Sequence, residues 1–166
     1  NVQPILVNHF KGRMALAHNG NLTNSRELRQ ELESRGSIFQ TTTDSEVIAY
    51  IIVQERLNRG SIEEAVSAAM DRIEGAYSLV LSSPTKLIAA RDPHGFRPLC
   101  MGHLKDGSVV FASESCALDA IGAEFERDIR PGEIVVVDTA GVRSDTSHCS
   151  KAPKKLCVFE FIYFAR

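Results

Sequence analysis

The sequence predicts an α+β fold in which helices and sheets form separate layers. Three helical patterns lie between residues 24 and 74, and after Gly75 the pattern changes to short β-rich runs separated by turn residues. Helices in one half and strands in the other favour two sheets with helices outside them over βαβ alternation. The length of 166 residues is enough for one domain with a substantial core, and no repeat or boundary appears before about residue 150.

Residues 4–7 and 14–17 predict the first two strands, joined by a polar connection. Asn19-Gly20 follows closely, and Asn-Gly is the commonest two-residue hairpin turn. The same pair also suits chemistry, because a ligand can approach the backbone N–H of Gly20 closely while the Asn19 carboxamide points the same way. Two converging neutral donors are what an oxyanion hole needs. These residues alone are compatible both with a hairpin turn and with an oxyanion hole.

Each of the three helices is predicted to begin with a capping box, in which Glu follows a polar residue three positions later. The pairs are Asn24 and Glu27, Thr43 and Glu46, and Ser61 and Glu64. Gly36, residues 58–60 and Gly75 are the expected stops. Apolar residues at helical spacing predict the buried face of each helix.

The second half predicts five short strands separated by turn signals such as Asp106-Gly107. Their expected ranges are 77–81, 86–90, 99–104, 109–112 and 134–137. A short helix is predicted over residues 114–121. Residues 139–153 are polar and lack an apolar period, so we expect mostly loop there.

Composition and charge exclude several classes of function. The chain is 43% hydrophobic and 24% charged, with a net charge of −2 from interspersed acidic and basic residues. The chain has no basic stripe that would predict a nucleic-acid partner. It also has no run of about 18 apolar residues that would predict a membrane span. No signal peptide is visible at the start. We therefore expect no membrane association and a cytoplasmic location.

Four cysteines occur without the spacing of a metal site or a redox motif. They are Cys100, Cys116, Cys149 and Cys157. Reduced thiols of a cytosolic protein explain them most simply, and a metal site completed by residues elsewhere is the alternative. The chain starts at Asn1 without an initiator Met and stops just after the apolar run 156–164, which indicates a piece of a longer protein.

Eight short segments occur in an order that is far more specific than any one of them. They are Asn1-Val2-Gln3-Pro4, Leu16-Ala17-His18-Asn19-Gly20-Asn21-Leu22, Thr43-Asp44-Ser45-Glu46, Gly75-Ala76-Tyr77-Ser78, Arg91 to Leu99, Ala112-Ser113-Glu114-Ser115, Pro131-Gly132-Glu133 and Phe159 to Arg166. The series resembles the glutaminase domain of the class II glutamine amidotransferases, and among them the members that act on phosphoribosyl pyrophosphate. The resemblance runs essentially from end to end.

The resemblance implies a fold and a domain plan. The family's fold is the four-layer αββα sandwich of the N-terminal-nucleophile hydrolases, which agrees with the α+β layering and would here be truncated at the N-terminus. Residues 1–150 would be a partial glutamine amidotransferase type-2 domain. Residues 151–166 would be the connection and first strand toward an absent phosphoribosyltransferase domain.

The resemblance also implies a reaction. In the family, a first-residue Cys with its own α-amino group as base attacks the side-chain amide of glutamine. The released ammonia then converts phosphoribosyl pyrophosphate to phosphoribosylamine in de novo purine synthesis, which makes the whole enzyme a glycosyltransferase of the phosphoribosyl type.

Three residues inherit roles by this comparison. Asn19 and Gly20 match the oxyanion pair, and Asp44 matches the carboxylate that binds the α-ammonium of glutamine. Asp44 also precedes a predicted helix, where Asp is a common cap. His18 is expected to be packed or turn-bonding and not a proton shuttle, because the family's base is the terminal amine.

Other polar residues near these motifs are expected to be structural or to act only in a longer protein. Arg91, Asp92 and Arg97 are expected to form an internal salt-bridge cluster. Cys157 matches a position that ligates a 4Fe-4S cluster in some members, but one thiolate cannot hold a cluster that usually takes four. We therefore expect no metal and no cofactor in this piece, with Mg²⁺ in the absent phosphoribosyltransferase domain.

The departures from the family pattern limit what this piece can do. No Cys begins the chain, and the Arg segment that grips the glutamine carboxylate is missing. We expect no glutaminase activity from these 166 residues alone. The expected partners are glutamine, phosphoribosyl pyrophosphate through the absent domain, and further copies of the full-length protein in a homo-oligomer. The alternatives are another class II amidotransferase, such as the glucosamine-6-phosphate-forming enzyme, and a non-catalytic glutamine-binding or scaffold module.

Overall fold

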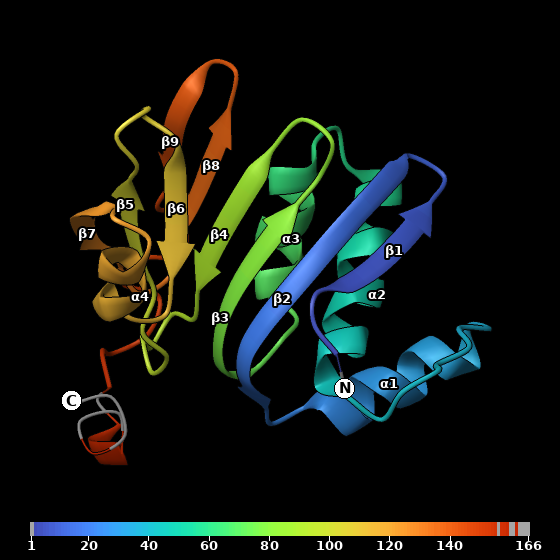
Figure 1. Cartoon of the computed structure of the whole chain (residues 1–166). Coiled ribbons are helices and arrows are strands. Elements are labelled where there is room, and N and C mark those ends of the chain that lie inside the picture. Colours follow the sequence, from blue (N-terminus) through green and yellow to red (C-terminus); the bar gives the residue numbers. More distant parts are fainter. Residues whose placement is uncertain (1, 156, 160–161, 163–166) are drawn as a thin grey trace.

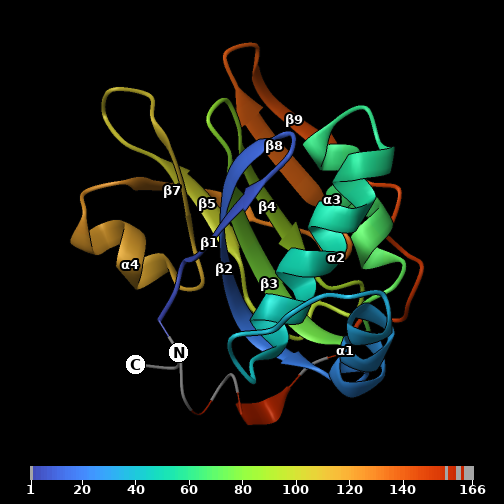
Figure 2. The same ribbon diagram turned by 90° about the vertical axis from the view of Figure 1, so that its right-hand side faces the viewer.

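The computed structural model describes residues 2–155, 157–159 and 162, which fold into four layers (Figures 1 and 2). The larger sheet is antiparallel and has six strands. In order across the sheet they are β1 (Ile5–His9), β2 (Gly12–Leu22), β3 (Gly75–Ser82), β4 (Leu87–Arg91), β8 (Ile134–Asp138) and β9 (Gly141–Asp145). Helices α1 (Ser25–Ser34), α2 (Asp44–Asn58) and α3 (Ile62–Met70) lie on one face.

A smaller sheet lies against the other face of the larger one. It consists of β6 (Val109–Ala112), β5 (Cys100–His103) and β7 (Glu124–Asp128), and helix α4 (Ser115–Ala120) covers its outer side (Figure 2). The order from helices through two sheets to a helix confirms the predicted αββα layering. In the part of the chain that the structure describes, no helix is long and apolar enough to cross a membrane.

Three apolar clusters hold the layers together. The largest lies between α1–α3 and the six-stranded sheet and includes the fully buried Leu16, Ile48 and Leu79. A second cluster joins the two sheets through residues such as Ala89 and Met101. A third packs α4 onto the small sheet through Leu118. Full burial of one such large side chain is worth roughly 1.5–3 kcal/mol.

The side chains of β2 alternate between two environments. Met14, Leu16 and His18 are buried on the side that carries the helices. Ala17 and Asn19 point to the other side, where the small sheet lies. This alternation of period two decides which residues of β2 can meet α2 and which can meet the small sheet.

Of the two interpretations of Asn19-Gly20, the hairpin turn is wrong. Strand β2 continues through Leu22, with Asn19 opposite Ser78 and Gly20 opposite Tyr77 of β3. The strand does not turn here because β3 offers partners along this whole stretch. Hairpin statistics miss this arrangement because the partners of Asn19 and Gly20 lie 59 and 57 residues later in the chain.

In two of the three predicted capping boxes, the side chain of the first residue caps the helix as expected. Thr43 Oγ1 accepts from the Glu46 N–H at 3.4 Å, and Ser61 Oγ accepts from the Glu64 N–H at 3.2 Å. The Asn24 prediction is wrong in detail, because the Asn24 side chain makes no cap hydrogen bond. Its amide instead donates to the Arg72 carbonyl at 2.9 Å and accepts from the Glu74 N–H at 3.0 Å.

Strands β7 and β9 were not predicted, and β9 lies inside the expected loop 139–153. Both are edge strands with mostly exposed side chains, so they show no apolar alternation. At the end of the chain, Val158, Phe159 and Ile162 are helical where a first strand was expected. Residues 156, 160–161 and 163–166 of that expected strand lie outside the described residues, as does Asn1.

Candidate functional site

Asn19 lines a cavity between the two sheets. The cavity has a volume of about 210 Å³, and Ala17, Phe111 and Ser113 also line it. Asn19 Nδ2 donates to Ser113 Oγ at 3.3 Å, which holds the carboxamide at this boundary. In the described residues, the amide donor of Asn19 therefore faces a space between the sheets that a small group could enter.

Gly20 occupies a backbone position that no other residue could take without strain. Its φ is +147°, in the region that favours glycine. A Cβ placed on Gly20 would lie 2.0 Å from the Ala76 carbonyl oxygen and 2.8 Å from Tyr77 Cα. The absence of a side chain here allows β2 and β3 to approach closely beside Asn19.

Asp44 is bound to the same strand from the helix side. It is the first residue of α2, and its Oδ2 accepts the backbone N–H of Leu22 at 2.9 Å. Its Oδ1 lies 3.6 Å from His18 Nδ1. A helix N-terminus favours a negative charge. The structure therefore joins Asp44 to β2 within a few residues of Asn19 and Gly20.

His18 is buried between β2 and α2. Its Nδ1 lies 2.9 Å from Ser45 Oγ, and its Nε2 is a buried atom with no hydrogen-bond partner among the described residues. Burial lowers the pKa of His18, the Asp44 carboxylate acts in the opposite direction, and Arg97 lowers it further. The imidazole is therefore neutral near pH 7, which agrees with a packed residue.

Sequence reasoning missed Gln3 as a support of this strand. Gln3 Nε2 donates to the His18 carbonyl at 2.8 Å, and the His18 N–H donates to Gln3 Oε1 at 2.6 Å. One side chain thus satisfies both backbone groups of His18, as a neighbouring strand would. Only its place in the first motif singled out Gln3, because a lone Gln before Pro carries no structural signal.

Arg91 and Asp92 build the loop that follows β4. Asp92 Oδ1 accepts the N–H groups of His94 at 2.9 Å and Gly95 at 2.8 Å. Arg91 donates to the carbonyls of Gly95 at 2.9 Å and Arg97 at 2.7 Å. These two charged residues thus bond to backbone groups of the loop, which is a structural role. The expected salt-bridge cluster of Arg91, Asp92 and Arg97 stays a prediction.

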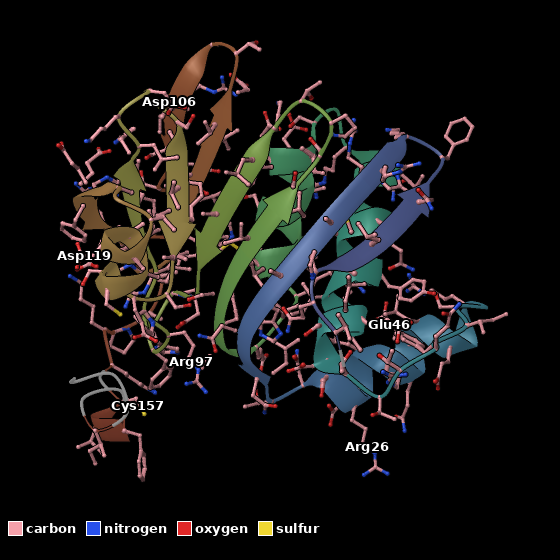
Figure 3. The ribbon with its side chains drawn as sticks, in the orientation of Figure 1. Arg26, Glu46, Arg97, Asp106, Asp119 and Cys157 are labelled. Carbon is pink, nitrogen blue, oxygen red and sulfur yellow. The ribbon has the colours of Figure 1, made fainter. Side chains whose placement is uncertain are left out.

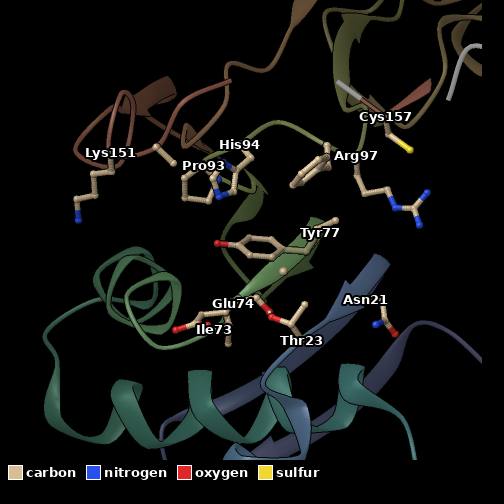
Figure 4. Close-up of a pocket in the computed structure, with 14 residues that line it drawn as sticks. Asn21, Thr23, Ile73, Glu74, Tyr77, Pro93, His94, Arg97, Lys151 and Cys157 are labelled. Atoms are coloured by element: carbon tan, nitrogen blue, oxygen red, sulfur yellow. The ribbon is translucent and has the colours of Figure 1, made fainter. Parts of the chain in front are cut away.

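A larger pocket of about 590 Å³ lies at the ends of β2 and β3 (Figure 4). Asn21, Tyr77 and Cys157 are among the residues that line it, whereas Asn19, Gly20 and Asp44 are not. Burial raises the pKa of Tyr77, whose hydroxyl has no hydrogen-bond partner among the described residues. We place the candidate site at the smaller cavity because the oxyanion candidate Asn19 lines it, whereas Gly20 and Asp44 line neither cavity.

The structure describes no donor set for a metal. Among the described residues, no three His, Cys, Asp or Glu side chains could hold a metal ion together. Cys157 lies on the C-terminal segment, far from helix α2, which carries Asp44 and Glu46 (Figure 3). A single thiolate does not fit an iron–sulfur cluster, so the described residues carry no chemistry through one.

A comparison with protein-family models matches residues 1–120 to the glutamine amidotransferase domain. The chain belongs to this family. Within the glutamine amidotransferase domain, the matched region contains Asn19, Gly20 and Asp44, and the fold continues beyond it through β7, β8 and β9.

Relatives of this glutamine amidotransferase domain carry a more specific name. The chain is 50% identical over 165 residues to the chloroplastic amidophosphoribosyltransferase of Vigna aconitifolia, covering 99% of this chain and 33% of the relative. It is 40% identical over 167 residues to the amidophosphoribosyltransferase of Bacillus subtilis strain 168, covering 100% of this chain and 34% of the relative. The chain thus spans about a third of the length of these relatives.

A solved structure supports the same fold. The glutamine phosphoribosylpyrophosphate amidotransferase from B. subtilis, described as complexed with ADP and GMP, matches with a TM-score of 0.91 and 40% identity. The match covers 100% of this chain and 36% of that chain. The predicted N-terminal-nucleophile architecture of the glutamine amidotransferase domain is thereby confirmed.

Proposed function

We propose that this chain forms the oxyanion-stabilising and ammonium-binding part of the glutaminase site of an amidophosphoribosyltransferase. The observation that carries the proposal is that one strand joins the three residues: Asn19 and Gly20 lie on β2, and Asp44 accepts the N–H of Leu22 from the helix side of the same strand. The complete protein would release ammonia from glutamine and use it to convert phosphoribosyl pyrophosphate to phosphoribosylamine. The names of the relatives support this reaction.

The chemistry assigned to these residues is electrostatic. When a thiolate attacks the glutamine side-chain amide, the carbonyl oxygen becomes an oxyanion, and the Asn19 carboxamide with the Gly20 N–H would donate to it. One such donor typically contributes about 3–4 kcal/mol to lowering the barrier. Asp44 would pair with the α-ammonium of the substrate. In the described residues no cysteine lines the Asn19 cavity.

The other partners of the complete protein are part of the same proposal. Phosphoribosyl pyrophosphate and Mg²⁺ would bind in the part of the protein that transfers the phosphoribosyl group. Cys157 would ligate an iron–sulfur cluster only if that part supplied the remaining thiolates. Homo-oligomerisation and a cytoplasmic location remain predictions, and the plant relatives are named as chloroplastic.

The test is Asn19→Ala in the complete protein that contains this chain. We expect glutamine-dependent formation of phosphoribosylamine to fall about 100- to 1000-fold, mostly in kcat, because one oxyanion donor is lost. Activity with an ammonium salt in place of glutamine should stay within about threefold, since it does not use this site.

Asn58→Ala, at the far end of α2, is the matched control and should leave both activities unchanged. The proposal is wrong if Asn19→Ala keeps full glutamine-dependent activity, or if both activities fall together. Ammonia release without any reaction of phosphoribosyl pyrophosphate would instead identify another class II amidotransferase.

A further inference from the structure

His18 is a buried polar residue to which the oxyanion mechanism gives no role. Its side chain is 1% exposed, and it projects from β2 toward the beginning of α2. Nδ1 lies within reach of Ser45 Oγ at 2.9 Å and of Asp44 Oδ1 at 3.6 Å. Buried polar side chains in folded proteins almost always form hydrogen bonds, so the partners of His18 indicate its role.

The two nitrogens of His18 differ in their surroundings, and this difference selects a tautomer. Nδ1 has oxygen partners, whereas Nε2 is buried and has none among the described residues. An N–H left without a partner in a buried place costs more than a lone pair left without one. The neutral imidazole therefore carries its proton on Nδ1 and donates it to Ser45 Oγ, with Asp44 Oδ1 beside this bond at 3.6 Å.

Asp44 is hydrogen-bonded to β2 through one carboxylate oxygen and faces His18 with the other. Oδ2 accepts the N–H of Leu22, four residues along the strand from His18, while Oδ1 lies on the His18 side. The side chain of Asp44 is 17% exposed, so the carboxylate is fixed but still accessible. The strand that carries the oxyanion donors thus also sets the place of the proposed ammonium acceptor.

We propose that His18 is a positioning residue. It holds Ser45 by a hydrogen bond and lies beside Asp44, and in this way it fixes the Asp44 carboxylate, which pairs with the α-ammonium of glutamine. It transfers no proton in the reaction. This role rests on the proposed function, because it requires Asp44 to bind the ammonium group. A residue with this role should control how well the site distinguishes glutamine from an analogue that lacks the ammonium.

The test compares KM for L-glutamine with the inhibition constant of glutaramate, which has the same side-chain amide but no α-amino group. The measurements use the complete protein and its ammonia release. For His18→Leu we expect KM for glutamine to rise at least tenfold while the inhibition constant of glutaramate changes less than threefold. His18→Asn places an amide nitrogen near the position of Nδ1 and should restore most of the preference.

Two further variants keep the test decisive if His18→Leu folds poorly. Ser45→Ala removes only a hydroxyl and should shift the same ratio in the same direction by a smaller factor. His148→Leu removes another buried histidine, which pairs with Asp71 at 3.0 Å, and should leave the ratio unchanged.

The possible results separate this role from its alternatives. An equal loss for both ligands in His18→Leu and Ser45→Ala would mean a purely structural role, and a fall in kcat at constant KM would mean proton transfer. Either result overturns the proposal. If wild type and Asp44→Asn show the same ratio of the two constants, the ammonium role of Asp44 in the proposed function is wrong, and the role of His18 is wrong with it.

Discussion

At the scale of single residues, the geometry of the candidate site depends on one side chain that supplies a donor and on one position that has no side chain. Asn19 supplies an amide donor that Ser113 holds in place. Gly20 supplies no atom beyond the backbone, and the Ala76 carbonyl occupies the space where a Cβ would be. The two residues were found from the sequence as an Asn-Gly pair, but their strand conformation was not, because it depends on β3.

Gly20→Ala should strongly destabilise the protein. The alanine would combine an unfavourable φ with a contact of 2.0 Å to backbone, so we expect a loss of about 3 kcal/mol or more in the free energy of unfolding. Gly12→Ala is the matched control, because Gly12 has a φ of +133° but no atom within 4 Å of the added Cβ.

Urea-induced unfolding of both variants measures the difference. Gly12→Ala should lose only about 1 kcal/mol, from strain in φ alone. Equal losses in the two variants would mean that the close approach of β2 and β3 at Gly20 contributes nothing.

At the scale of elements, α2 is the helix most closely joined to the candidate site, because its first residue is Asp44, the proposed ammonium acceptor. Thr43 caps it, and Glu46 accepts from the N–H groups of Gln40 at 2.9 Å and Thr41 at 2.8 Å. Burial opposes ionisation of Glu46, but these hydrogen bonds outweigh it and lower the pKa of Glu46. The loop before α2 is therefore tied to the helix that it introduces.

Thr43→Ala should lower the free energy of unfolding by about 1 kcal/mol, because the Glu46 N–H loses its side-chain acceptor. Thr43→Ser keeps the hydroxyl and should recover most of this loss. Thermal and urea unfolding of the two variants provide the measurement. A Thr43→Ser variant as unstable as Thr43→Ala would show that the methyl group, and not the cap, is responsible.

Elements with local signals were predictable, and elements that depend on distant partners were not. The caps at Thr43 and Ser61 are local, and both are confirmed. Asn24 has the same local signal, but its side chain binds the connection between α3 and β3, about fifty residues away in sequence. Strands β7 and β9 are held by backbone pairing at sheet edges, which leaves no apolar pattern in the sequence.

At the scale of the whole molecule, one buried carboxylate connects the two sheets. Glu133, just before β8, accepts two hydrogen bonds from Arg127 of β7 at 2.8 and 2.9 Å and one from Ser144 of β9 at 2.7 Å. Burial opposes its ionisation, but the bonds from Arg127, the Arg130 N–H and Ser144 outweigh it. The pKa of Glu133 is therefore lowered from 4.5.

This shift predicts how stability depends on pH. Because the folded pKa lies below the unfolded one, the contribution of Glu133 is fully present above pH 4.5 and is lost as the pH falls through the lowered value. Glu133→Gln should cost about 3 kcal/mol at pH 7, since it leaves Arg127 without its charged partner. The difference from wild type should shrink below pH 4.5.

Urea unfolding at a series of pH values on both sides of 4.5 measures this dependence. Asp138→Asn is the control, because its partner Arg143 is half exposed and solvent screens the pair. A Glu133→Gln variant whose deficit stays constant down to low pH would contradict the prediction.

The alternation of β2 has a consequence for how this part of the gene can change. The side chains of His18 and Asn19, for which we propose roles in positioning Asp44 and in oxyanion donation, lie on opposite faces because one position is even and the other odd. Inserting or deleting one residue between Gly12 and Ala17 would exchange the two faces, while a change of two residues would preserve them. In active homologues, insertions and deletions within β2 should therefore contain an even number of residues, or should fall in the β1–β2 connection.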